Sequence, residues 1–146
     1  MDWLRAFIWP EQAAERDRLA AAIAISRRQP PSVVRADAVT DLAELLDRAP
    51  ADLPICVFHA TLLTYVDRQA TAELFESLRR EVGRRAVSWV YLEAAGLLRG
   101  PGAPTAVTDE HRADRDTFVL GLVAQGVDRV LARVATYGES VHWLGP

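Results

Sequence analysis

Continuous apolar runs alternate with amphipathic stretches in the middle of the chain, a pattern typical of strands alternating with helices. Residues 55–60 are almost entirely apolar, and we expect a parallel strand there that is buried on both faces. From Asp67, the expected N-cap, to Arg84, apolar residues recur at helical spacing. Residues 87–92 are apolar again. The pattern predicts a strand, helix, strand unit with a right-handed crossover.

The segment before this unit predicts two helices and a short strand. Pro10 suits the first position of a helix that we expect to end at about Arg28, with an apolar stripe of Leu19, Ala22, Ile23 and Ile25. A strand is expected at 32–36, around two valines, and a second helix at 41–48, before a proline.

The segment after the unit predicts a long connection and then a small antiparallel meander. Residues 94–116 combine glycines, prolines and scattered charges without a clear period, so we expect an irregular connection. Three strands are expected at 117–124, 129–135 and 140–144, joined by turns at Gln125-Gly126 and Tyr137-Gly138.

Together these elements predict a single α/β domain of the three-layer, Rossmann-like kind, with a mixed sheet that is parallel in its centre and closed by an antiparallel meander. A chain of 146 residues is long enough for one such domain. All eight glycines lie at or beyond Gly83, however. A Gly-rich cofactor loop at a strand-to-helix turn in the first half of the chain is therefore excluded.

Composition narrows the functional classes. The net charge of −3 disfavours a nucleic-acid surface, and the absence of lysine excludes Schiff-base and P-loop chemistry. Cys56 is the only cysteine, so no disulfide can form within one chain, and we expect a cytoplasmic setting. No segment predicts a signal peptide or a membrane span. The three histidines lack the spacing of a helical metal pair, so no metal site is expected.

Several motifs resemble the C-terminal part of a bacterial family, domain of unknown function 2332 (DUF2332), and the overall pattern resembles the back half of class I methyltransferases. The motifs are Trp3-Leu4-Arg5-Ala6-Phe7-Ile8-Trp9-Pro10-Glu11, Val33-Val34-Arg35-Ala36-Asp37-Ala38, Val57-Phe58-His59-Ala60 with Tyr65, Leu131-Ala132-Arg133 and His142-Trp143-Leu144. Family members are longer and carry a Gly-rich strand and turn upstream. The resemblance therefore implies a fragment or a shortened relative without the Gly-rich strand.

The resemblance also implies a set of site residues. Asp37, Ala38 and Phe58 would contact S-adenosylmethionine, and His59 and Tyr65 would position the acceptor. Thr61 and Glu93 would lie near the same place, because open α/β sheets bind ligands at the carboxyl ends of their strands.

Each of these side chains also has a purely structural interpretation. Asp37 could cap the start of the following helix. His59 could be a neutral histidine that hydrogen-bonds to a backbone group. Tyr65 could be a packed aromatic residue with its hydroxyl at the edge of the core. Glu93 is expected to end its strand in solvent, and His111 to lie in a solvated loop.

Three functional hypotheses follow. The first is a methyltransferase-like family member that is not catalytic as this chain alone, because the Gly-rich loop is missing. The second is an S-adenosylmethionine-dependent methyltransferase. The third is a non-catalytic interaction module in which the apolar N-terminal segment and residues 94–116 bind a partner, with self-association through the N-terminal segment.

Overall fold

The computed structural model describes residues 2–113, 117–135 and 138–145. Contacts between residues divide the chain into two compact units, Met1–Arg35 and Ala36–Pro146, and each unit is described by itself. That the whole chain folds as a single domain stays a prediction. No helix of the described residues is both long and apolar enough to cross a membrane.

The Met1–Arg35 unit is helical. It contains α1 (Asp2–Arg5) and α2 (Ala13–Arg28), with Gln12 as the N-cap residue of α2. Of the four residues expected to form a buried stripe on α2, only Ile23 is buried within the structure. The aromatic side chains of the first turn and loop, Trp3, Phe7 and Trp9, are exposed.

The strand expected at 32–36 does not form. The segment that would contain it has no regular secondary structure, and Val33 and Val34 are exposed. Two adjacent β-branched residues favour extended backbone, but a strand also needs a neighbouring strand for its hydrogen bonds. No described strand pairs with this segment, so local propensity alone gave the wrong prediction.

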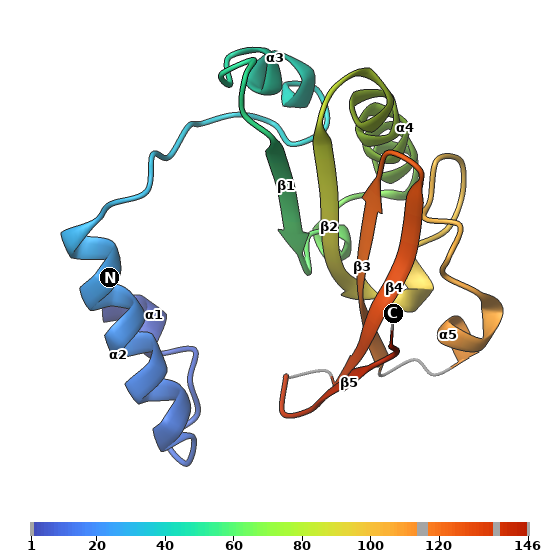
Figure 1. Ribbon diagram of the computed structural model, residues 1–146. Helices are drawn as coiled ribbons and strands as arrows, with labels where there is room; N and C mark the ends of the chain where they lie inside the picture. Colours follow the sequence, from blue (N-terminus) through green and yellow to red (C-terminus); the bar gives the residue numbers. More distant parts are fainter. Residues whose placement is uncertain (1, 114–116, 136–137, 146) are drawn as a thin grey trace. The chain divides into compact units, whose positions relative to one another are not determined.

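The Ala36–Pro146 unit contains a five-stranded open mixed sheet (Figure 1). Its strands follow the chain in the order β1-β2-β3-β4-β5. They are β1 (Ile55–Ala60), β2 (Val87–Ala94), β3 (Thr117–Ala124), β4 (Val127–Ala135) and β5 (Val141–Trp143). Only β1 and β2 are parallel, and the other neighbours are antiparallel. The mixed sheet, the parallel pair and the closing meander are thus confirmed. The sheet is not parallel in its centre, however, because its one parallel pair includes the edge strand β1.

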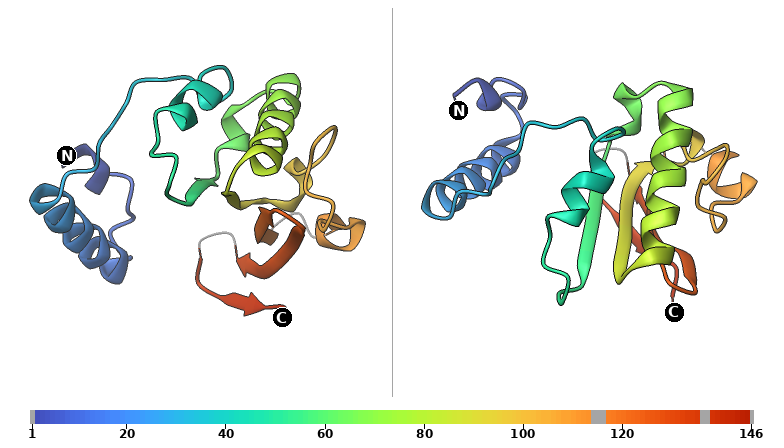
Figure 2. Two further views of the ribbon diagram at one scale, coloured as in Figure 1. Left: turned by 45° about the horizontal axis from the view of Figure 1, so that its top comes forward. Right: turned by 90° about the horizontal axis from the view of Figure 1, so that it is seen from above.

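The parallel pair is connected by α4 (Arg68–Arg84), which packs on one face of the sheet (Figures 1 and 2). Asp67 is its N-cap, as predicted, because its Oδ1 accepts the Ala70 N–H at 2.9 Å. The ring of Phe75 lies 5.5 Å from that of Trp89 on β2, and both are fully buried. The shorter helix α3 (Leu42–Asp47) contacts the far end of α4, where Arg85 Nη1 donates to the Leu46 carbonyl.

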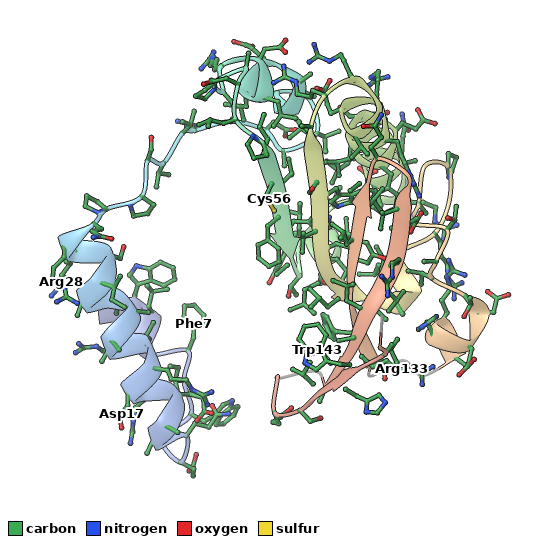
Figure 3. All side chains as sticks on the ribbon, viewed as in Figure 1. Phe7, Asp17, Arg28, Cys56, Arg133 and Trp143 are labelled. Atoms are coloured by element: carbon green, nitrogen blue, oxygen red, sulfur yellow. The ribbon has the colours of Figure 1, made fainter. Side chains whose placement is uncertain are left out.

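Burial along β1 alternates, which corrects the prediction that this strand is buried on both faces. His59 is buried, whereas Phe58 is exposed. Cys56 is exposed as well (Figure 3). The reason is that the helices of the Ala36–Pro146 unit pack on the face of the sheet that carries Trp89, so the β1 residues on the other face are exposed. An apolar run does not distinguish a strand covered on both faces from a strand covered on one face.

The connection between β2 and β3 is more ordered than its sequence predicts. It contains two short helices, η2 (Ala95–Leu97) and α5 (Asp109–Ala113). Arg79 of α4 fastens it by donating to the carbonyls of Gly102 and Ala103. The predicted turn at Gln125-Gly126 is present, with Gly126 at φ 73°. Of the turn predicted at Tyr137-Gly138, Tyr137 lies outside the described residues.

Candidate functional site

Two polar side chains meet at the carboxyl ends of the parallel strands. His59 lies opposite Tyr91 in the β1–β2 register, and Glu93 is two residues beyond Tyr91 on the same face of β2. The Nδ1 atom of His59 lies 2.8 Å from Oε1 of Glu93. Both side chains are buried, Glu93 completely. The expectation that Glu93 ends its strand in solvent is therefore wrong.

The hydrogen bonds of His59 indicate which ring nitrogen donates and which accepts. Trp89 Nε1 lies 2.9 Å from His59 Nε2, and an indole nitrogen can only donate. Nε2 is therefore the acceptor, and the imidazole proton is on Nδ1, where it is donated to Glu93. Both ring nitrogens of His59 are used inside the protein, so one of these bonds must open before the ring can act on a ligand.

Glu93 also holds the turn that follows β1. Its Oε1 accepts the Leu62 N–H at 2.7 Å and its two oxygens lie 3.4 Å from the Leu63 nitrogen. These groups begin the short helix η1 (Leu63–Tyr65). Thr61, just before it, has φ 56°, an uncommon value for a β-branched residue. A buried carboxylate thus fixes an otherwise strained turn, as is frequent near functional sites.

A pocket of about 300 Å³ opens beside this turn. One wall comes from Leu63 and Val66 and the first turn of α4, and the other comes from residues 96–101. The first wall follows the carboxyl end of β1 and the second follows that of β2, the edge at which open α/β sheets hold ligands. The volume lies at the lower end of the range for small-molecule sites.

Three polar side chains line this pocket without a partner. Arg68 and Arg99 are exposed, and their guanidinium groups form neither an ion pair nor a hydrogen bond with any described residue. Thr71 is only 6% exposed, and its hydroxyl has no hydrogen bond within the described part of the chain. Gly96 and Gly100 complete the opposite wall. We refer to Arg68, Thr71 and Arg99 as the pocket triad.

Asp37 is part of a local turn. Its Oδ1 accepts the N–H groups of Val39 and Thr40 at 2.8 and 3.0 Å, and its own N–H donates to Asp41 Oδ2. The Thr40 and then the Val39 N–H groups lower the pKa of Asp37. The strand that would have placed Asp37 at a ligand-binding edge is absent. This geometry matches the helix-entry interpretation, because α3 begins five residues later.

The other predicted residues are spread over different surfaces. Ala38 is exposed next to Asp37, and Phe58 is exposed on the face of β1 opposite His59. Tyr65 is 84% exposed, so the expected packing of its ring is wrong, and it does not line the pocket. The structure therefore brings together His59 and Glu93, with Thr61 in the adjacent turn, and leaves Asp37, Ala38 and Phe58 without a described contact to them.

Sequence reasoning missed Trp89 and the pocket triad. Nothing in a single apolar strand indicates which distant side chain the indole of Trp89 will meet. Arg68 and Thr71 follow the predicted N-cap Asp67. Their position in the first turn of the helix after β1 is the feature of the sequence that could have indicated a pocket residue.

His111 lies in α5 with its Nδ1 accepting the Thr108 N–H, rather than in a solvated loop. No three described His, Cys, Asp or Glu side chains cluster closely enough to hold a metal ion.

These features define an α/β protein with an open mixed sheet and a small pocket at the carboxyl ends of its parallel strand pair. The chain belongs to the family described as "Uncharacterized protein conserved in bacteria (DUF2332)", whose model matches residues 1–143. No curated protein and no solved structure matches it.

Proposed function

We propose that the Ala36–Pro146 unit binds a small molecule in the pocket beside Glu93. The observation that carries this proposal is the pocket of about 300 Å³ whose two walls directly follow β1 and β2. The buried His59, Trp89 and Glu93 side chains support it indirectly, because Glu93 fixes the turn that contributes Leu63 to the pocket wall. The binding surface is thus preformed, which reduces the conformational cost of binding.

A fragment screen read by nuclear magnetic resonance tests this proposal. Glycine-selective labelling of the chain gives signals from eight glycines, of which Gly96 and Gly100 line the pocket. Fragments that bind in the pocket are expected to shift these two signals. Gly126 is the internal control, because its turn follows Val123, which pairs with Trp89 away from the carboxyl end of β2. A screen without any shift at Gly96 and Gly100 would contradict the proposal.

A second candidate is binding of S-adenosylmethionine on a Rossmann-like scaffold, with Asp37, Ala38 and Phe58 contacting the cofactor and His59 or Tyr65 positioning a methyl acceptor. The parallel β1–α4–β2 unit favours it. The turn between β1 and α4 contains no glycine, so we do not expect catalysis by this chain alone. Calorimetric titration with S-adenosylmethionine and S-adenosylhomocysteine tests the candidate, and the absence of heat at millimolar ligand with a folded protein contradicts it.

A third candidate is an interaction module. Trp3, Phe7 and Trp9 are 65%, 73% and 73% exposed, and exposed aromatic clusters are typical of protein contacts. Light scattering of the chain over a range of concentrations is expected to show association, and replacement of Phe7 and Trp9 by serine is expected to reduce it. A monomer at all concentrations, without binding of a hydrophobic dye, contradicts this candidate.

A further inference from the structure

The chemistry of the pocket indicates which ligands it accepts. We propose that the pocket triad of Arg68, Thr71 and Arg99 binds the oxyanion group of a small organic molecule, a phosphate or a carboxylate. This inference rests on the proposed function of the same pocket and adds the ligand class.

The first line of argument concerns charge. Two guanidinium groups line one small pocket, although the chain as a whole carries a net charge of −3. Other arginines of the same two segments do have partners: Arg79 of α4 binds Asp128, and Arg112 of α5 binds Asp109 and the Leu98 carbonyl. Arg68 and Arg99 have no acceptor among the described residues. The planar donor fork of arginine matches the oxygen atoms of carboxylate and phosphate groups.

The second line of argument concerns Thr71. The Thr71 hydroxyl forms no hydrogen bond with a described residue, but its oxygen is not among the completely buried atoms without a partner, so it is accessible to a ligand. Thr71 is nine-tenths buried and lines the pocket between the two arginines' segments, so a ligand oxygen would satisfy its hydroxyl. This observation is independent of the arginines, and it points to the same acceptor chemistry.

The third line of argument concerns the backbone. The pocket wall includes the first turn of α4, a helix of 17 residues whose amino end favours negative charge. The Asp67 carboxylate beside this end already accepts the Ala70 N–H. The apolar side chains of Leu63, Val66 and Leu97 line the same space. The pocket thus combines donors for an oxyanion with an apolar wall, which suits a small organic acid or phosphate ester.

Three related probes of similar size test the inference: phenyl phosphate, benzoate and benzyl alcohol. They are titrated into the glycine-labelled chain up to about 10 mM, where binding of roughly −3 kcal/mol is still measurable. We expect phenyl phosphate, benzoate or both to shift Gly96 and Gly100, with weaker binding at higher salt, and benzyl alcohol to bind more weakly. The two anionic arms distinguish a phosphate site from a carboxylate site.

Substitutions test the assignment of the donors. Arg68→Gln and Arg99→Gln are each expected to weaken binding of the anionic probe about tenfold, the usual effect of losing one charged hydrogen bond. Thr71→Val is expected to weaken it and Thr71→Ser to restore it. The matched control is Arg80→Gln, since Arg80 is an exposed arginine of the same helix that does not line the pocket.

Three outcomes would overturn the inference. If benzyl alcohol shifts Gly96 and Gly100 as strongly as the anions, the pocket binds ligands but does not select oxyanions. If the arginine variants bind the anions as tightly as Arg80→Gln, the oxyanion is held elsewhere. If none of the three probes shifts either glycine, the ligand class is wrong, and the fragment screen then decides separately whether the pocket binds anything.

Discussion

Two polar clusters lie close together at the carboxyl ends of β1 and β2, and they differ in how completely their hydrogen bonds are formed. In the first cluster His59, Trp89 and Glu93 bind one another and the backbone of the following turn. In the second, the pocket triad, the side-chain donors have no partner among the described residues.

This difference separates structural from binding roles. Buried polar groups that satisfy one another make the surrounding structure rigid, and removing one member leaves the others unsatisfied. Donors without partners contribute little to the folded state and remain free to bind a ligand. Substitutions in the first cluster should therefore lower stability, whereas substitutions in the pocket triad should lower affinity at nearly constant stability.

The largest effect is expected from Glu93→Ala. The substitution leaves His59 Nδ1 and the Leu62 and Leu63 N–H groups without their acceptor in a buried position. Each buried donor left without an acceptor costs about 1–3 kcal/mol, and three donors lose their acceptor here. Chemical denaturation followed by far-ultraviolet circular dichroism measures the loss. The matched control is Glu76→Ala on the exposed face of α4, and equal stability of the two variants would contradict the structural role of Glu93.

A second cluster of side chains with all their hydrogen bonds formed surrounds Asp128. Substitution of Asp128 should lower stability less than Glu93→Ala, and the loss should depend on pH. Asp128 accepts hydrogen bonds from Arg79 and from the N–H and hydroxyl of Thr105. Burial acts to raise the pKa of Asp128, but these donors outweigh it and the pKa is lowered. Asp128→Asn is expected to cost about 1.5–3 kcal/mol at neutral pH, the usual value for hydrogen bonds to a charged group.

The sign of the pH dependence follows from the lowered pKa of Asp128. The stabilisation is fully present above the unfolded value of 3.8 and is lost as the pH falls through the lower folded value. Denaturation curves of both proteins at neutral and acidic pH measure this. The stability difference between the unsubstituted chain and Asp128→Asn should shrink below about pH 4, and a difference that grows on acidification would contradict this account.

Two aromatic residues on the same face of β2 provide a finer comparison. Trp89 Nε1 donates to His59, whereas the buried Tyr91 hydroxyl has no hydrogen-bond partner among the described residues. Burial raises the pKa of Tyr91 well above its usual value, so the hydroxyl stays protonated. Tyr91→Phe is expected to leave stability unchanged or to raise it by up to about 1–2 kcal/mol, because it removes an unsatisfied group.

The control for Tyr91→Phe is Trp89→Phe, which removes a hydrogen bond that is formed and leaves His59 Nε2 without its donor. Trp89→Phe should lower stability in the same denaturation assay. A clear loss of stability in Tyr91→Phe would show that the hydroxyl is satisfied in solution, and the contrast between the two residues would then disappear.

The same two clusters explain how much could be predicted from the sequence. The helix at α4, its N-cap Asp67 and the parallel pairing of β1 with β2 follow from periodicity and local capping, so they were predicted correctly. The burial of Glu93 was not predicted correctly. The sequence at the end of a strand does not indicate whether its last side chain contacts solvent or a histidine 34 positions away.

The prediction of a strand at 32–36 was wrong for a related reason. Extended propensity is a local property, whereas strand pairing depends on which segment lies alongside. The predicted role of Asp37 depended on that strand and on a resemblance, and the predicted roles of Ala38 and Phe58 depended on the resemblance alone. Prediction therefore succeeded where neighbours in the sequence decide the structure, and it failed where the partner is distant.

The smallest effect on stability is expected from Arg68→Gln and Arg99→Gln. Neither guanidinium has a partner to lose among the described residues, and exposed substitutions of this kind usually change stability by no more than about 0.5 kcal/mol. The measurement is the same denaturation assay, with Arg85→Gln as the contrasting variant because Arg85 binds the Leu46 carbonyl and Asp47. If Arg68→Gln destabilised the chain as much as Arg85→Gln, Arg68 would have a structural partner in solution. Arg68 would then belong to the structural side chains, and the pocket triad could no longer be described as free for ligand binding.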